Sequence, residues 1–124
     1  HWQISDQGEI VAGIKTSRRD PNTDSPPVIK PEDLGRWIHL ATTLDRNAQQ
    51  VIHYVDGEAV IIDTRTDLPP LKIGAAEIGN WHPSHVKVPK KSPIRSLNGR
   101  IDEFMVLKRA LSATEIAALY EAGR

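Results

Sequence analysis

The C-terminal quarter of the chain carries the pattern that most limits the fold, because it reads as a turn, a strand and a short capped helix in succession. Asn98 and Gly99 indicate the turn, since both residue types tolerate a positive φ. Apolar side chains occupy both faces of the period-two pattern in residues 101–107, which predicts an interior strand covered on two sides. A strand of this kind needs a sheet around it, so we expect a fold built mainly from β-strands.

The predicted helix that follows has strong start signals. Ser112 is a good N-cap, and Glu115 three residues later completes a capping box. Leu111 and Ile116 are spaced to form a hydrophobic staple across the cap, and Gly123 offers a left-handed stop. A helix of about three turns is marginal alone, so we expect it to pack on the sheet.

Composition supports one all-β domain over residues 1–124. Nine prolines and eight glycines separate short apolar runs, as in a domain of many strands and turns. Sixteen basic residues balance sixteen acidic ones, which gives no electrostatic reason to expect nucleic acid or an anionic membrane as partner. No apolar run is long enough to insert into a membrane, and no signal peptide is visible. Cysteine is absent, which excludes disulfides and cysteine-based zinc sites.

Strand patterns recur through the rest of the chain. The predicted strands, in chain order, are residues 2–5, 9–14, 36–44, 49–55, 58–64 and 71–73. Asp56 and Gly57 form the strongest hairpin signal. Two long loops, residues 17–32 and 79–96, interrupt the strands, and sites commonly lie on such loops.

Five short motifs occur in order along the chain, at residues 35–45, 54–58, 71–74, 97–104 and 109–116. Together they resemble the laminin-G-like, concanavalin A-like lectin/glucanase jelly-roll domains of bacterial extracytoplasmic proteins. The resemblance implies an antiparallel two-sheet jelly-roll sandwich with one short C-terminal helix, and a periplasmic, cell-surface or secreted location. Domains of this family begin with strands ahead of the segment that matches Trp2, so we expect those strands to be missing here. We also expect a homodimer through the open sheet edge that their absence leaves.

The candidates for catalysis and metal binding are few. Asp102 and Glu103 are neighbours on a predicted strand, so they point to opposite faces and cannot flank one glycosidic bond together. Glycosidases of this fold resemble one another in a Glu-x-Asp-x-x-Glu strand, and the chain has no such pattern. We therefore expect no enzyme activity, with Asp102 bonded to nearby backbone and Glu103 to a cross-strand partner. Asp56 is a weak candidate calcium ligand, by similarity to family members that bind calcium at a sandwich rim, but the hairpin turn explains it better.

The loop over residues 79–96 holds the best ligand candidates. A sugar presents an apolar C–H face that stacks on an indole, while amide and imidazole groups bond its hydroxyls. The residues that fit this chemistry are Asn80, Trp81, His82 and His85. The alternative is that Trp37 and Trp81 are core anchors. Two histidines without cysteine are too few for zinc, so we expect no metal site and no cofactor.

A basic patch lies in the same loop. It consists of Lys87, Lys90, Lys91 and Arg95, and residues 79–96 contain no acidic residue. Such a patch fits an acidic glycan or a phosphate, although a charge run in a loop is commonly only solvated.

These observations favour a non-catalytic recognition or adhesion module, binding carbohydrate or protein, within a larger exported bacterial protein. The alternative is a structural spacer or accessory domain of an envelope regulator or hydrolase, with no small-molecule ligand.

Overall fold

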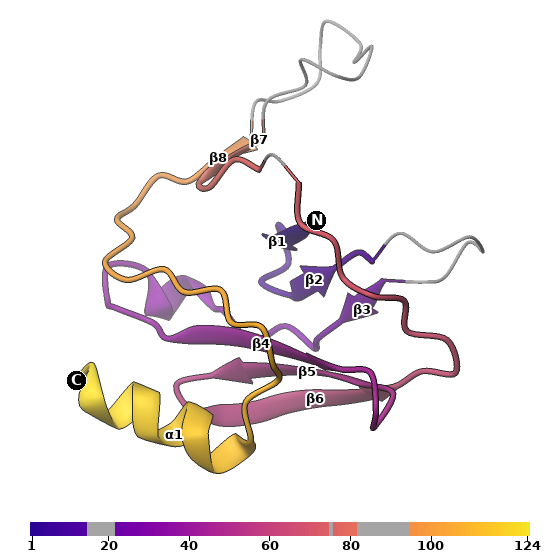
Figure 1. The fold of residues 1–124 in the computed structure, drawn as a ribbon. Coiled ribbons are helices and arrows are strands. Elements are labelled where there is room, and N and C mark those ends of the chain that lie inside the picture. The colour runs from indigo at the N-terminus through magenta and orange to yellow at the C-terminus, as the bar shows by residue number, and fades with distance from the viewer. Residues whose placement is uncertain (15–21, 75, 82–94) are drawn as a thin grey trace, which may run out of the picture. The chain divides into compact units, whose positions relative to one another are not determined.

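The computed structural model describes residues 1–14, 22–74, 76–81 and 95–124 of the chain (Figure 1). These residues form two compact units. One consists of His1–Leu71 with Leu107–Arg124, and the other of Lys72–Val106. The first unit contains two three-stranded antiparallel sheets and one short C-terminal helix, and the second contains a two-stranded sheet. The chain therefore has the mostly β architecture that the sequence predicts, consistent with a concanavalin A-like sandwich.

The first sheet is formed by β1 (Trp2–Ile4), β2 (Ile10–Ala12) and β3 (Thr23–Asp24), in the order β1-β2-β3. The predicted N-terminal hairpin is confirmed, with Gln3 opposite Val11. Gly8 has a φ of 79°, and its carbonyl accepts hydrogen bonds from the amides of Val28 and Ile29. A Cβ at Gly8 would overlap the carbonyl oxygen of Ile29, so the close approach of these two backbone segments requires glycine.

The second sheet is formed by β4 (Leu40–Asp45), β5 (Gln50–Val55) and β6 (Glu58–Thr64), in the order β4-β5-β6. The predicted hairpin between β5 and β6 is confirmed. Asp56 has a φ of 50° and Gly57 a φ of 84°, so both turn residues are left-handed, as a tight two-residue hairpin requires. β5 is the central strand, and it carries buried side chains on both faces, with Val51 and His53 on one face and Tyr54 on the other. The buried apolar side chains of the chain's described part are Ile10, Val11, Ala12, Val51, Tyr54, Leu68 and Ile116.

The helix α1 (Ala113–Ala122) begins at the predicted capping box. The amide of Glu115 donates to Ser112 Oγ at 3.3 Å, and the amide of Ser112 donates to Glu115 Oε2 at 2.8 Å. Ile116 is buried, which fixes the apolar side of the helix. The predicted left-handed stop at Gly123 is wrong, because Gly123 has a φ of −94°. Its amide donates to the carbonyls of Leu119 and Tyr120, so the last turn closes without a left-handed residue.

The strand predicted over residues 101–107 is not formed. This segment has no ladder pairing within the part of the chain that the structure describes, and its apolar side chains are exposed. Neither Asn98 nor Gly99 adopts the positive φ on which the turn prediction rested. An alternating sequence sets the period of a strand, but a strand forms only where a neighbouring strand supplies the hydrogen bonds.

Two other strand predictions differ from the structure. The strand predicted over residues 36–44 begins only at Leu40, because the amide of His39 donates to the carboxylate of Asp56 rather than to a second strand. Trp37 is therefore outside the strand and 64% exposed, so the interpretation of Trp37 as a core anchor is wrong. Residues 71–73 are exposed and form no strand, since the preceding Pro69 and Pro70 have no amide hydrogen to give to a ladder.

Candidate functional site

Two of the ligand candidates, Asn80 and Trp81, form one strand of a short hairpin in the second unit. β7 (Asn80–Trp81) pairs antiparallel with β8 (Arg95–Ser96), and the ladder continues where the amide of Leu97 donates to the carbonyl of Gly79 at 2.7 Å. Gly79 has a φ of 73°, a conformation that glycine adopts at little cost as the chain enters this hairpin.

The register of this hairpin sets one residue of the proposed sugar-binding group opposite one residue of the basic patch. Asn80 lies opposite Ser96, and Trp81 lies opposite Arg95. Residues directly opposite each other in an antiparallel pair have Cα atoms about 4.5–5.5 Å apart. The backbone therefore places the tryptophan of the ligand group beside the arginine of the basic patch. The remaining candidates, His82, His85, Lys87, Lys90 and Lys91, lie outside the described residues.

The two carboxylates considered for catalysis lie outside any strand of the described residues. Asp102 and Glu103 are both exposed, in the segment that forms no strand. Within the described residues neither has a hydrogen bond or an ion pair, so the predicted backbone and cross-strand partners of these two side chains are not found. The described residues also contain no group of three or more histidine, cysteine, aspartate or glutamate side chains placed to hold a metal ion.

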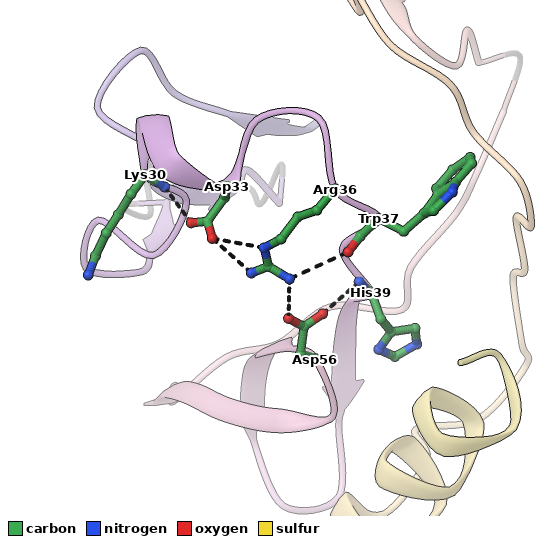
Figure 2. A network of polar contacts seen from close by, with 6 residues as sticks. All are labelled: Lys30, Asp33, Arg36, Trp37, His39 and Asp56. Carbon is green, nitrogen blue, oxygen red and sulfur yellow. Dashed lines mark hydrogen bonds and ion pairs between the residues drawn. The ribbon is translucent and has the colours of Figure 1, made fainter.

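Asp56, the weak calcium candidate, is part of a polar network at the hairpin turn (Figure 2). Arg36 Nη1 donates to Asp56 Oδ2 at 2.9 Å, and the amide of His39 donates to Asp56 Oδ1 at 2.9 Å. Arg36 also bonds Asp33 Oδ1 at 2.9 Å, so one guanidinium bridges two carboxylates. Both oxygens of Asp56 therefore face hydrogen-bond donors, which is the environment of a structural ion pair rather than of a calcium ligand.

The same network shifts two pKa values. The amide of Lys30 and then the guanidinium of Arg36 lower the pKa of Asp33, because both stabilise the carboxylate form. Hydrogen bonds to Asp56 and Asp33 raise the pKa of Arg36. The network lies directly before Trp37, whose backbone carbonyl also accepts a hydrogen bond from Arg36 at 3.4 Å (Figure 2).

The two histidines in predicted strands have different surroundings. His53 is fully buried, and both of its ring nitrogens are hydrogen-bonded, to Thr42 and to the carbonyl of Thr23. Burial lowers the pKa of His53, since the charged form would lose its water. His39 packs its ring against Tyr120 of α1 with the centroids 5.9 Å apart, and its buried Nδ1 has no hydrogen-bond partner among the described residues.

Sequence reasoning missed a series of hydrogen bonds that begins at Trp2. The indole Nε1 of Trp2 donates to Thr42 Oγ1 at 2.8 Å, and Thr42 is bonded in turn to His53. The available signal was a single tryptophan near the N-terminus together with a threonine and a histidine on the same predicted faces of neighbouring strands. That signal does not specify that Trp2 lies beside β4.

Comparison with known proteins identifies the family. Residues 1–117 match the family model Laminin_G_3, described as the concanavalin A-like lectin/glucanases superfamily. Because this match covers nearly the whole chain, the protein belongs to that superfamily, as the five motifs suggested. A search of curated proteins found no match.

One solved structure is similar over most of the chain. It is the 2.1 Å crystal structure of residues 221–444 of an S-layer domain-containing protein from Clostridium thermocellum. The sequence identity is 26% and the TM-score 0.58, and the match covers 90% of this chain and 50% of the solved chain. The protein thus spans about half the length of its structural neighbour. No helix within the described residues has the length and apolar character needed to cross a membrane.

Proposed function

We propose that the protein is a non-catalytic recognition or adhesion module that binds carbohydrate, within a larger exported bacterial protein. The observation that carries the proposal is the pairing of Trp81 with Arg95 across the β7–β8 hairpin. Paired positions of one ladder therefore hold a tryptophan and an arginine. These residue types suit a sugar ring that bears an acidic group, because an indole stacks on the C–H face and a guanidinium binds the acid.

The charge of the surrounding loop supports an acidic glycan over a neutral one. Residues 79–96 contain several lysines and Arg95 but no acidic residue, although the chain as a whole has no net charge. A local excess of positive charge in a neutral protein concentrates anionic ligands at one place without attracting polyanions in general. This argument also favours a glycan over nucleic acid as the partner.

The absence of catalysis is part of the proposal. It is supported by the missing Glu-x-Asp-x-x-Glu pattern and by the exposure of Asp102 and Glu103 in a segment that forms no strand among the described residues. Export is supported by the resemblance to an S-layer domain-containing protein, because S-layer proteins are proteins of the cell surface.

The second candidate function is a spacer or accessory domain with no small ligand. It is favoured by the same structural neighbour, since a domain within an S-layer protein can serve assembly rather than recognition. A protein partner, or a homodimer through a sheet edge, is compatible with either candidate.

A glycan array probed with the wild-type protein and with the variants W81A and R95A separates the two candidates. We expect the wild-type protein to bind acidic polysaccharides. Each variant should bind with an affinity about tenfold or more lower, because it lacks a stacking or charge-assisted contact. W37A is the matched control, because Trp37 is an exposed tryptophan of the other unit. Absence of binding to every glycan supports the spacer instead, and an equal loss in W37A would mean that the β7–β8 hairpin is not the binding site.

A further inference from the structure

Residues 101–108 form an apolar segment with no strand partner. Within the described chain no backbone hydrogen bond involves residues 101–107, and Phe104 is 63% and Met105 57% exposed. Val106 and Leu107 are exposed as well. An apolar segment whose amides and carbonyls have no partner among the described residues is a template for pairing with another strand. The question is which strand completes it.

We propose that this segment pairs with the same segment of a second copy of the chain, as an antiparallel ladder with Met105 of each copy opposite the other. The ladder makes the protein a two-fold symmetric dimer. Two-fold symmetry allows this, because an antiparallel pair of identical strands can place one residue opposite its own copy. The proposal goes beyond the recognition function and does not depend on it.

The order of charges along the segment favours self-pairing. The acidic residues Asp102 and Glu103 stand at one end, and the basic residues Lys108 and Arg109 stand at the other. Antiparallel pairing of two copies therefore sets an acidic end against a basic end twice, whereas parallel pairing sets like charges together. Asp102, Glu103 and Lys108 have no ion pair within the described residues, so all three are available for a partner.

The charges also select the register. With Met105 opposite its own copy, Asp102 lies opposite Lys108 and Phe104 lies opposite Val106, all on one face of the ladder. That face has four apolar side chains from the two copies, flanked at each end by an ion pair. The apolar centre excludes water from the ladder, and the ion pairs fix its alignment.

The two neighbouring symmetric registers are worse. A centre at Phe104 sets Arg100 opposite Lys108, which repel each other. A centre at Val106 sets Glu103 opposite Arg109. However, Arg109 is already bonded to both oxygens of Glu115 in α1, at 2.6 and 3.0 Å. Pairing in that register would cost an existing two-bond contact, so the register centred on Met105 is favoured.

Such an interface is small. One strand from each copy lies at the low end of specific interfaces, below about 1,200 Å² of total buried surface. We therefore expect a dimer whose population depends on protein concentration, rather than an obligate one.

Charge reversal tests the register directly. In D102K the two copies would set lysine against lysine, and in K108E they would set aspartate against glutamate. Sedimentation equilibrium should show a dimer for the wild type and a dissociation constant about tenfold or more higher for each variant alone. An equimolar mixture of D102K and K108E should recover dimerisation, because each lysine of one variant then faces an acid of the other.

The variant K72E is the matched control, since Lys72 is exposed and lies outside the segment. It should leave the dimer unchanged. A monomer at every concentration, a dimer insensitive to the two reversals, or a mixture that fails to recover would each overturn the proposal. A monomer whose amides at residues 103–107 resist hydrogen exchange would also overturn it, because another segment would then occupy the strand position.

Discussion

His53 in β5 and Thr23 in β3 join the two three-stranded sheets through one buried hydrogen bond of 3.1 Å. A carbonyl oxygen only accepts, so Nε2 of His53 carries the proton and donates it to Thr23. Nδ1 then accepts from the hydroxyl of Thr42 at 2.8 Å, and Thr42 accepts from the indole of Trp2. Each hydrogen bond in this series therefore has a defined donor and a defined acceptor. The series requires that His53 be neutral.

Stability should therefore fall as the pH drops below the ordinary pKa of histidine. Burial lowers the pKa of His53 from its usual value of 6.5, although nearby Asp24 and Asp63 oppose this effect. Above pH 6.5 both the folded and the unfolded chain hold this histidine neutral, so its full contribution is present. Below pH 6.5 the unfolded chain takes up the proton first, so the free energy of unfolding decreases until the folded pKa is reached. Urea unfolding between pH 8 and pH 5 measures this dependence.

The variant H53Q is the control for this pH dependence, since an amide can donate to Thr23 and accept from Thr42 but does not titrate. It should lower stability at pH 8 by about 1–3 kcal/mol through imperfect packing and hydrogen bonding. Its stability should then change less between pH 8 and pH 5 than that of the wild type. An identical slope in both proteins would assign the pH dependence to other groups.

The sequence predicts those parts of the fold whose determinants are local. The left-handed turn at Asp56-Gly57 and the capping box of Ser112 and Glu115 depend on residues within a few positions, and the structure contains both. The contact of His53 with Thr23 joins residues 30 positions apart, and no local pattern specifies it. The segment over residues 101–107 shows the same limit, because its apolar, strand-like pattern is local but its strand partner is not encoded nearby.

The region of the candidate site was singled out from the sequence as a loop, and its β7–β8 hairpin was not predicted. A tryptophan and a basic patch in one long loop identified the region, and side-chain chemistry gave a reason to single it out. The register that sets Trp81 opposite Arg95 depends on how β7 and β8 are aligned along each other. Loop length alone does not determine this alignment. A register shifted by two residues would keep every side chain on the same face of the ladder.

Removal of the helix cap should cost a measurable part of the stability. Ser112 accepts the amide of Glu115, and its own amide is bonded to the Glu115 carboxylate. Ser112→Ala leaves an amide at the helix start without its acceptor, so the free energy of unfolding should decrease by about 1 kcal/mol. Chemical denaturation measures the change. T66A, at an exposed threonine outside the helix, is the control, and an equal effect of both would contradict the role of the cap.

The pKa of Glu115 reports the contact between the helix and the preceding segment. Hydrogen bonds from Arg109 first, and then from Ser112, lower the pKa of Glu115 to about 2. The contribution of this carboxylate is present above its unfolded pKa of 4.5 and is lost as the pH falls towards about 2. Arg109→Met removes the largest cause, so a titration of Glu115 followed by NMR should show its pKa rise towards 4.5. An unchanged titration would mean that the cap alone holds the carboxylate ionised.

The two glycines Gly57 and Gly35 offer a matched test of how α1 packs on the second sheet. Both have a left-handed φ, 84° and 90°, so alanine at either position carries a similar backbone strain of about 1–2 kcal/mol. A Cβ at Gly35 would meet nothing within 4 Å, whereas a Cβ at Gly57 would lie 3.0 Å from Cδ1 of Tyr120 and 3.3 Å from Cα of Ala117.

Gly57→Ala should therefore destabilise the protein more than Gly35→Ala, by a further 1 kcal/mol or so, because the helix must shift away from the β5–β6 turn. Truncation of the clashing ring in the double variant G57A/Y120A should recover part of this difference, which double-mutant analysis of urea unfolding measures. Equal costs for the two alanine variants would mean that α1 moves freely on the turn. In that case the ring contact between His39 and Tyr120 would not hold the helix in place.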